Sequence, residues 1–350
     1  MKDETTIRSG STTLNDKVNF LSKLQTYPNA LTLEVIETHM SWVFLTDLFV
    51  YKLKKPVQYD FLDFTSLEVR YKYCMEEVRI NMKLAEDIYQ GVVPLTIYKN
   101  LLQLNGAGEV IDWLVKMKRL PETKMLHKAI NTDSVCIKDL QRAAEKLVNF
   151  YLTSRPVKPE EEIFMRQIIN DIEHNCKELC RDEFDLPHAL IVRIETDLLH
   201  FISKYKQVFN QRLEDGRVVD GHGDLRPEHI CLTPIPVIID RIEFNRDLRI
   251  MDVAEELSHF ALECEILGSP SIGKLFFNVY ERKSHERIPV ALICFYKAKR
   301  ALLRAKLSAH HLLEKQYIVE INKWKNRCRE YLQIANSYCD QLWDEQKVRN

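Results

Sequence analysis

A polar loop framed by apolar segments, within residues 217–240, constrains this chain more than any other stretch. A short valine-containing strand leads into the loop, which holds two glycines, and two further apolar segments follow at 229–232 and 237–240. The Pro-rich turn between these two segments indicates that they form a hairpin. Because a hairpin sends the chain out and back, we expect Asp224 and Asp240 to lie close together in space.

Two carboxylates at the mouth of a hairpin can divide the chemistry of a phosphoryl transfer. One carboxylate can accept the proton of the attacking hydroxyl, while the other holds the metal ion that carries the phosphates. The pair Asp224 and Asp240 therefore predicts a phosphotransferase site.

Residues 222–230, HGDLRPEHI, resemble the catalytic loop of the protein-kinase-like superfamily, and more closely that of its aminoglycoside phosphotransferase branch, which has Gly after the His. Residues 238–258, IIDRIEFNRDLRIMDVAEELS, resemble that branch's metal-binding Asp and a structural Asp that opens a helix. Further matches occur in IETHMSWVFL, YKLKKP and CMEEVRINMKLAEDIY. The resemblance covers roughly residues 30–310 and points to a bacterial subgroup of uncharacterised aminoglycoside-phosphotransferase-like proteins.

The resemblance implies an α+β, protein-kinase-like two-lobed fold. A small N-lobe would contain an antiparallel sheet and one long helix, and a larger C-lobe would be mostly helical. We expect a flexible tail over residues 1–17, the N-lobe over 18–120 and the C-lobe, with the catalytic loop, over 121–350. Alternation and periodicity agree with this division. The expected strands are 31–37, 42–45, 48–54, 91–97 and 110–116, and the expected helices are 18–24, 66–86, 139–151, 160–179, 189–211, 252–267, 290–313 and 317–342.

The third expected strand supplies the lysine that would meet the phosphates. Side chains alternate faces along a strand, so Lys52 and Lys54 share one face. By the resemblance, Lys52 binds the phosphates of ATP, with Lys54 as the fallback, and Glu77 of the long helix pairs with the lysine. The alternative is that both lysines are solvated residues of an edge strand and that Glu77 is an exposed helix carboxylate.

No G-x-G-x-x-G precedes the lysine strand, and the aminoglycoside phosphotransferase branch also lacks that pattern. The segment Thr38–Ser41 stands there instead, so we expect backbone amides and hydroxyls such as that of Ser41 to cover the phosphates. Residues 117–121 would form the hinge between the lobes, where backbone groups around Met117 and Arg119 would bind the adenine edge.

By the resemblance, Asp224 is the catalytic base, which orients the acceptor hydroxyl and takes its proton. Arg226 lies two positions later, where protein kinases have a Lys that meets the transferring phosphate, and a guanidinium could do the same. His222 would fix the loop. Asp252 would cap a helix and brace the catalytic loop from the start of that helix.

Asp240 is the expected principal metal ligand, whereas position 229 departs from the family pattern. The family has an Asn there as a further ligand, but this chain has His229. Imidazole is a poor ligand for Mg²⁺ and a better one for Mn²⁺. His229 could therefore coordinate a softer metal, only form hydrogen bonds, or mark the loss of the second metal site. Glu243 could replace the missing ligand or be a loop ion-pair partner.

Two other patterns in the sequence could each mark a binding site. Gly268–Lys274 matches a G-x-x-x-x-G-K phosphate loop, but Leu275 stands where a Ser or Thr must bind Mg²⁺, and a helix rather than a strand precedes it. Lys297, Arg300 and Arg304 share a helical face, which either lines a pocket for an anionic acceptor or is a solvated surface.

Composition limits the partners. The formal net charge of −1 argues against nucleic acid or an anionic membrane as the main partner. No apolar run is long enough to span a bilayer, and the N-terminal residues lack the apolar segment of a signal peptide. Nine cysteines without a C-x-x-C pair indicate reduced thiols in a cytoplasmic protein.

The leading hypothesis is therefore an ATP-dependent phosphotransferase, or kinase, that uses Mg²⁺ or Mn²⁺ and phosphorylates a hydroxyl of a small molecule. The sequence identifies neither the acceptor nor the oligomeric state. Two alternatives stay open: a pseudokinase-like nucleotide-binding regulatory module, and a nucleotidyl transferase on the same fold.

Overall fold

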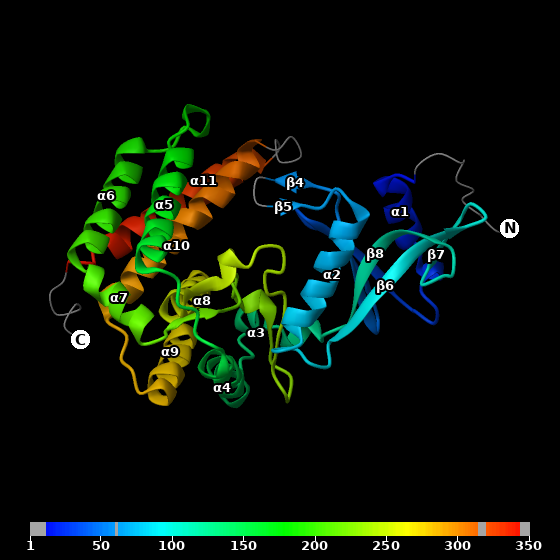
Figure 1. The fold of residues 1–350 in the computed structure, drawn as a ribbon, viewed down its shortest axis with the longest axis horizontal. Coiled ribbons are helices and arrows are strands. Elements are labelled where there is room, and N and C mark those ends of the chain that lie inside the picture. The colour runs from blue at the N-terminus through cyan, green and yellow to red at the C-terminus, as the bar shows by residue number, and fades with distance from the viewer. Residues whose placement is uncertain (1–11, 60–61, 314–319, 344–350) are drawn as a thin grey trace. The chain divides into compact units, whose positions relative to one another are not determined.

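The chain folds into two compact units, shown in Figure 1. The structure is a computed structural model that describes residues 12–59, 62–313 and 320–343. The first unit comprises the chain up to Asp133 together with Glu228–Leu248, and the second comprises Ser134–Pro227 together with the chain from Arg249 onward. The first unit therefore extends past the N-lobe predicted over 18–120, because it gains a segment from the predicted C-lobe.

A six-stranded sheet forms the centre of the first unit, in the order β1-β2-β3-β8-β6-β7. Each neighbouring pair is antiparallel, so the predicted antiparallel sheet is confirmed. The strands of this sheet are β1 (Leu33–Glu37), β2 (Ser41–Thr46), β3 (Phe49–Lys54), β6 (Tyr89–Tyr98), β7 (Leu101–Leu104) and β8 (Glu109–Lys118).

Strand β7 was not expected from the sequence. It forms a hairpin with β6 through Lys99 and Asn100, which both have positive φ, at 49° and 62°. Two successive residues with positive φ make the type of tight turn that matches the twist of a hairpin. Only the Asn of this pair is a usual residue for such a turn, so the signal in the sequence is weak.

The helix α2 (Leu67–Asn81) packs on β6 and β8 (Figure 1). It begins at Ser66, whose side chain accepts a hydrogen bond from the N–H of Val69 and so caps the first turn. Along β3, Tyr51 and Leu53 belong to an apolar core that also contains residues of β2, β6 and β8. The shorter elements of this unit are α1 (Leu14–Leu21), η1 (Leu24–Thr26), β4 (Gln58–Tyr59), β5 (Leu62–Asp63), η2 (Glu122–Lys124) and α3 (Leu126–Asn131).

The helix α1 contains the last part of the predicted flexible tail. Thr13 and Asp16 form a capping box at its start. The Nζ of Lys17 lies 2.7 Å from the buried carboxylate of Asp112, which Arg70 of α2 also contacts at 2.8 Å. Residues 14–17 are therefore helical and anchored, and residues 1–11 of the predicted tail lie outside the described residues.

The predicted hairpin after the polar loop is present, with shorter arms than expected. The strands β10 (Ile230–Cys231) and β11 (Val237–Ile238) pair antiparallel. Cys231 and Val237 join the apolar cluster of Cys74, Tyr89 and Val115. This burial explains why the hairpin belongs to the first unit.

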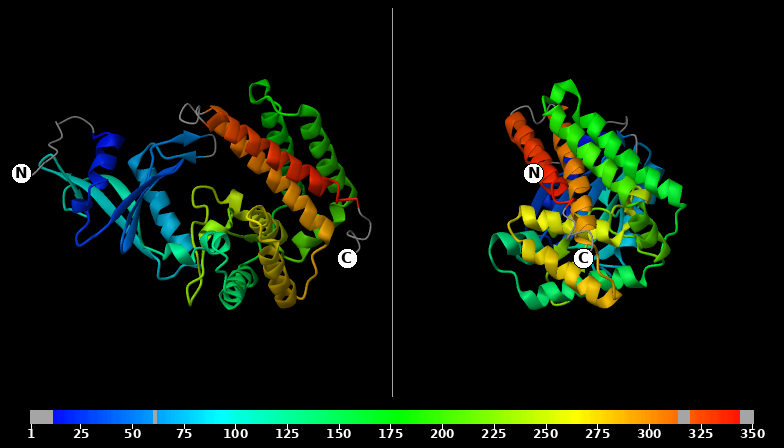
Figure 2. Two further views of the ribbon diagram at one scale, coloured as in Figure 1. Left: turned by 180° about the vertical axis from the view of Figure 1, so that it is seen from behind. Right: turned by 90° about the vertical axis from the view of Figure 1, so that its left-hand side faces the viewer.

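The second unit is mostly helical, as predicted for the C-lobe. The helix α10 packs against α5, α6, α8 and α11, and these helices are seen from two further sides in Figure 2. The helices of this unit are α4 (Ile137–Thr153), α5 (Glu161–Leu179), η3 (Asp182–Phe184), α6 (His188–Lys204), α7 (Lys206–Glu214), η5 (Asp247–Arg249), α8 (Val253–Ile266), α9 (Pro270–Ser284), α10 (Val290–His310), η6 (His311–Leu313) and α11 (Ile321–Cys339). The turn η4 (Pro227–His229) and η5 each contain a boundary between the units.

The helix predicted over 189–211 is two helices in the structure. Tyr205 has φ −116° and ψ 28°, so it ends α6 and precedes α7. Its ring packs on Phe201, with the ring centroids 4.8 Å apart. Neither Pro nor Gly occurs at the break, so no helix-breaking residue marks it in the sequence.

The polar loop begins in the second unit. Strand β9 (Val218–Asp220) leads into it and pairs antiparallel with β12 (Ile250–Asp252), which comes directly before α8. The turn between α8 and α9 contains Gly268, which has a φ of +77°. The helix α8, and not a strand, comes directly before this turn, so the G-x-x-x-x-G-K match lacks the context of a phosphate loop.

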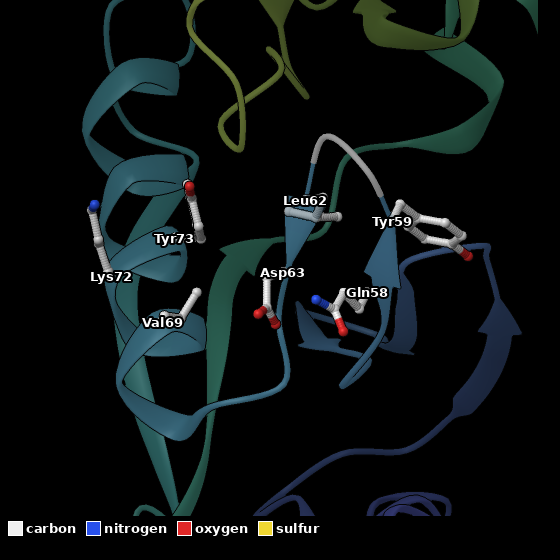
Figure 3. Close-up of a pocket in the computed structure, with 7 residues that line it drawn as sticks. All are labelled: Gln58, Tyr59, Leu62, Asp63, Val69, Lys72 and Tyr73. Atoms are coloured by element: carbon white, nitrogen blue, oxygen red, sulfur yellow. The ribbon is translucent and has the colours of Figure 1, made fainter.

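A hollow lies between the β4–β5 hairpin and α2, and Figure 3 shows the residues that line it. None of the predicted site residues is among them. No helix within the described residues is long and apolar enough to cross a membrane. All nine cysteines lie in the described part of the chain, where each is a free thiol.

Candidate active site

Two lysines of β3 meet one buried carboxylate of α2. The Nζ of Lys52 lies 3.0 Å from Glu77 Oε1, and the Nζ of Lys54 lies 2.6 Å from Glu77 Oε2. The exposed fraction is 16% for the Lys52 side chain and 1% for that of Lys54. The pairing predicted for one lysine is therefore present for both, and the alternative of two solvated lysines does not hold.

Asp240 joins this network from the end of the hairpin. Its Oδ1 lies 2.7 Å from the Nζ of Lys52, and 43% of its side chain is exposed. Its backbone has φ +64°, in the left-handed region that Asp tolerates better than most residues. The backbone N–H of Asp240 donates to the hydroxyl of Tyr89 at 3.1 Å. Asp240 therefore has a carboxylate that contacts Lys52 and is also partly exposed to solvent.

His229 lies beside this carboxylate. Its Nε2 is 3.7 Å from Asp240 Oδ2, which is beyond a hydrogen bond. The carbonyl of His229 accepts from the N–H of Ile239 at 2.9 Å, so the hairpin fixes its position opposite Asp240. The imidazole and the carboxylate are thus close enough to share a ligand.

Glu243 is an ion-pair partner of Lys54, which was one of the two alternatives for this residue. It is buried, and burial raises the pKa of Glu243 above its usual range. Its carboxylate contacts Lys54, and its predicted role as a replacement for the Asn that the family has at position 229 stays a prediction. Within the described residues, no group of three or more His, Cys, Asp or Glu side chains could hold a metal ion by itself.

Opposite charges stabilise this buried network. Burial opposes the charge on Lys52, but Asp240, Glu77 and Glu243 outweigh it and hold the pKa of Lys52 well above its usual value. Burial likewise disfavours the ionised form of Glu77, and the two lysines overcome it, so the pKa of Glu77 is lowered. Two lysines and three carboxylates thus meet in one network.

The segment that carries Asp240 is anchored on the end of α2. The backbone N–H of Arg241 donates to Asn81 Oδ1 at 2.9 Å, and the Arg241 side chain donates to the carbonyl of Ile80 at 2.8 Å. Arg241 and Asn81 are both buried. No signal for this anchor is present in the sequence, because the burial of Arg241 is visible only in the structure.

The three other predicted nucleotide contacts lie on the sheet. Ser41 begins β2, is buried, and donates its N–H to Thr38 Oγ1 at 3.0 Å, so the turn before β2 is closed by hydroxyl contacts. Met117 lies within β8, opposite Val50. The Arg119 side chain donates to the carbonyl of Thr46 at 2.9 Å, so its guanidinium is held at the sheet.

In the second unit, Asp224 lies between two arginines. Its Oδ1 accepts a hydrogen bond from Nη2 of Arg300 at 2.6 Å, and its Oδ2 lies 3.1 Å from Nε of Arg226. The Asp224 side chain is 30% exposed and that of Arg300 is 5% exposed. The structure therefore brings Asp224 and Arg226 together and adds Arg300 of α10, while the predicted roles of Asp224 and Arg226 stay predictions.

Glu256, rather than the predicted Asp252, braces the predicted catalytic loop. Glu256 of α8 accepts hydrogen bonds from the backbone N–H groups of His222 at 3.0 Å and Gly223 at 2.6 Å. It also accepts from the Tyr151 hydroxyl at 2.6 Å. A Cβ on Gly221 would lie 2.7 Å from the Glu256 carboxylate, so this close approach favours glycine.

Asp252 has a different task at the start of α8. Its carboxylate accepts from the N–H of Ala254 at 2.8 Å, which confirms the predicted helix cap. It also contacts Arg212 of α7 and the hydroxyl of Tyr296 on α10. Asp252 therefore ties three helices together, whereas Glu256, one turn further along α8, contacts the loop.

The predicted site residues thus form two sets. The first unit brings together Lys52, Lys54, Glu77, Asp240, Glu243 and His229. The second unit holds Asp224 with Arg226. The approach of Asp224 to Asp240 stays a prediction.

The chain resembles known proteins in sequence and in fold. No family model matches the chain. Uncharacterised proteins of Mycobacterium bovis and Mycobacterium tuberculosis are 28% identical over 284 residues, which is 79% of this chain and 54% of theirs. The chain therefore spans about half the length of the curated relatives it matches.

Solved structures of small-molecule kinases share the fold. A choline/ethanolamine kinase family protein from Mesorhizobium loti has a TM-score of 0.52 at 13% identity, covering 93% of this chain and 99% of that one. A choline kinase from Cryptosporidium parvum has a TM-score of 0.53 at 13% identity, with coverages of 93% and 96%. The GDP complex of wild-type aminoglycoside 2′-phosphotransferase-IIIa has 0.50 at 12% identity, with 90% and 99%.

The fold is therefore that of the protein-kinase-like phosphotransferases, as the sequence predicted. The resemblance of the catalytic loop to the aminoglycoside phosphotransferase branch agrees with these neighbours.

Proposed function

We propose that this chain is an ATP-dependent phosphotransferase that phosphorylates a hydroxyl of a small molecule. The observation that supports it most is the set Lys52, Glu77 and Asp240, in which a lysine held by a buried helix carboxylate also contacts an exposed Asp. In kinase-like enzymes such a lysine meets the phosphates and the helix carboxylate keeps it aimed. The kinase-like fold supports the same assignment.

In the proposed reaction, the acceptor oxygen forms a bond to the γ-phosphorus of ATP. The bond from that phosphorus to the β–γ bridging oxygen breaks, and ADP leaves with the electron pair. Asp224 orients the hydroxyl and takes its proton, which then passes to solvent. Arg226 would neutralise charge on the transferring phosphate. Because Arg300 and Arg226 contact the two oxygens of Asp224, the acceptor hydroxyl would share one of these oxygens or displace an arginine contact.

Asp240 and His229 are the proposed metal ligands. The half-exposed Asp240 carboxylate suits Mg²⁺, which often binds one or two protein carboxylates together with substrate phosphates. The imidazole of His229, 3.7 Å from Asp240, makes Mn²⁺ equally suitable. Such an ion would neutralise phosphate charge when bound. Glu243 is held by Lys54 and is not a proposed ligand.

The test combines nucleotide binding with turnover. We expect calorimetry to show ATP binding with Mg²⁺ or Mn²⁺, and ADP release to depend on an acceptor alcohol. Asp224→Asn should lower turnover by about 100-fold or more, because general-base catalysis contributes on that scale, while nucleotide affinity changes little. A protein that binds no nucleoside triphosphate with either metal would refute the proposal.

A nucleotide-binding module without transfer is the second candidate. His229 in place of the family's Asn and the two arginine contacts to Asp224 favour it. ATP binding with no phosphate or adenylate transfer, in Mn²⁺ as well as Mg²⁺, would support this module. The mass of any product separates phosphate addition from nucleotidyl transfer.

A further inference from the structure

A bulge near the start of β6 determines where the side chain of Tyr89 lies. Tyr89 and Gly91 are two positions apart in this strand, but their partners in β8, Met117 and Lys116, are adjacent. Gln90 is therefore the extra residue of a β-bulge. Gly91 has φ +121°, which glycine adopts far more readily than residues with a side chain. A Cβ there would meet no heavy atom of the described residues within 4 Å, so the backbone conformation and not a lack of space favours glycine.

The bulge turns Tyr89 toward the face of the sheet on which α2 lies. Side chains alternate along a regular strand, so Tyr89 would otherwise share a face with Val93 and Leu95, which pack in one apolar core. One extra residue moves the side chain before it to the opposite face. Tyr89 instead packs with Val92 in a second apolar cluster, which contains Cys74 of α2, and it is 4% exposed. The bulge thus brings a tyrosine hydroxyl to this side of the sheet.

The hydroxyl of Tyr89 supplies the middle one of three successive backbone contacts around Asp240. The N–H of Ile239 donates to a backbone carbonyl at 2.9 Å, the N–H of Asp240 to this hydroxyl at 3.1 Å, and the N–H of Arg241 to Asn81 Oδ1 at 2.9 Å. Asp240 has φ +64°, a conformation that costs free energy and persists only where its surroundings hold it. The sheet, through Tyr89, therefore helps to hold this conformation.

From this arrangement we infer that Tyr89 is a positioning residue for the metal site. Its hydroxyl fixes the backbone of Asp240, and because an aspartate side chain is short, the backbone largely sets where the carboxylate lies. The inference rests on the proposed function, in which Asp240 is a metal ligand. Groups that orient a metal ligand govern metal affinity nearly as strongly as the ligands themselves.

Hydrogen exchange tests the contact without any metal ion. Tyr89→Phe keeps the ring and removes the acceptor of the Asp240 N–H. We expect this amide to exchange with deuterium about fivefold faster or more, because a hydrogen bond is lost, while the Ile239 amide keeps its rate. NMR of the full chain measures both amides, and equal rates for the Asp240 amide in wild type and Tyr89→Phe would overturn the inference.

Manganese binding gives a second readout that does not need turnover. Water-proton relaxation follows Mn²⁺ binding in the presence of a non-hydrolysable ATP analogue. Tyr89→Phe should raise the Mn²⁺ concentration at half-saturation about tenfold or more. Gly91→Ala strains the bulge and should act in the same direction. If an acceptor is phosphorylated, saturating Mn²⁺ should restore most of kcat in Tyr89→Phe.

Two control variants separate positioning from stability. Tyr27→Phe removes a buried hydroxyl that donates to the Leu21 carbonyl at 2.7 Å, in the other apolar core. Gly268→Ala introduces similar backbone strain in the second unit, at φ +77°, where a Cβ also has space. Both should lower the urea concentration at the midpoint of unfolding and leave the Mn²⁺ half-saturation unchanged.

The outcomes distinguish this inference from the proposed function. If Tyr89→Phe lowers stability but leaves the Mn²⁺ half-saturation unchanged, Tyr89 is only structural and the inference is wrong, whatever the enzyme transfers. If exchange and Mn²⁺ binding change as expected but no phosphate is transferred to any acceptor, the inference stands and the proposed phosphotransferase fails. A wild-type protein that binds no Mn²⁺ with the analogue would overturn both.

Discussion

Lys52 and Lys54 both contact Glu77, but their other partners differ. Lys52 contacts the half-exposed Asp240, and Lys54 contacts the buried Glu243. Lys52 is therefore placed to meet a ligand, whereas Lys54 neutralises two carboxylates inside the first unit. The sequence could not separate the two, because strand alternation puts both on one face.

Substituting the two lysines should have different effects. Lys52→Met should lower turnover by about 100-fold or more with modest loss of stability. Lys54→Met leaves Glu77 and Glu243 buried without this partner, so unfolding free energy should fall by about 3–5 kcal/mol. Urea unfolding and steady-state turnover measure the two effects. Adding Glu243→Gln to Lys54→Met should recover stability, and equal effects of both single substitutions would contradict the assignment.

Glu256 is a positioning residue for the catalytic loop. In Glu256→Gln the amide keeps the size of the side chain but accepts fewer of the three hydrogen bonds from the loop and Tyr151. We expect turnover to fall roughly tenfold with KM unchanged, since the loop's backbone donors would be left partly unpaired. Glu265→Gln is the matched control, because Glu265 is on the same helix and also contacts a tyrosine hydroxyl. Unchanged turnover in Glu256→Gln would show that the loop needs no brace.

The sequence analysis assigned this brace to Asp252, and the reason for the error is local. Asp252 and Glu256 are one helical turn apart, so both point toward the same side of α8. The motif identifies which acid opens the helix, and that cap is present. Which of the two acids reaches the loop depends on how β9 and β12 pair. No sequence pattern predicts the distance from either carboxylate to the loop.

At the scale of elements, α8 is unusual because nearly all of it is buried. Residues 253–264 are buried on every side, including Glu255, Glu256 and His259. Such a helix has no apolar stripe, and its charges must be paired inside the unit. Burial lowers the pKa of His259 to about 4, with Arg300 and Lys299 acting in the same direction against Glu255.

This burial predicts a pH dependence of stability. His259 has a pKa of about 4 in the folded state and 6.5 as its ordinary value, so between these values the unfolded chain binds more protons. Stability should therefore fall as pH drops from 6.5 toward 4, by up to about 3 kcal/mol from this residue, at about 1.4 kcal/mol per pKa unit. Urea unfolding between pH 7 and 4.5 measures the slope, and His259→Gln should flatten it. The pKa of Glu255 is lowered to about 2, so its contribution is lost below 4.5.

Helices and strands with strong periodicity were predicted well, and the remainder depended on packing. The long helix α2, the cap at Asp252 and the catalytic hairpin follow from patterns that short segments contain. The break at Tyr205 and the strand β7 do not, because neither Pro nor Gly marks the first and the turn before the second contains an unusual Lys. Arg300 was noticed only as part of a basic face, since its contact to Asp224 joins positions distant in sequence.

At the scale of the molecule, the two units are not two consecutive pieces of chain. The first unit needs the segment Glu228–Leu248, which supplies Asp240 and Glu243 to the lysines and Cys231 to the apolar cluster. The predicted boundary near residue 120 assumed consecutive lobes. Composition and periodicity change there, but the partners of Lys52 and Lys54 come from beyond residue 227.

A fragment of residues 1–133 should therefore not fold by itself. Its Lys52 and Lys54 would lack the carboxylates of the missing segment, and its apolar cluster would be open. We expect no cooperative unfolding by circular dichroism for this fragment. Joining residues 228–248 to it through a flexible Gly-Ser linker should restore a cooperative transition. Cooperative unfolding of 1–133 without the addition would contradict this account.

The three passages of the chain between the units set an order on biosynthesis. On the ribosome, the sheet emerges first, but the segment that neutralises its interior lysines is translated only after more than ninety further residues, 134–227. Until that segment is translated, the interior lysines of the nascent sheet lack the carboxylates that neutralise them. Complete folding of the first unit must accordingly wait until residue 248 has been translated, and slow decoding before that point would prolong the exposure of this unit to chaperones and proteases.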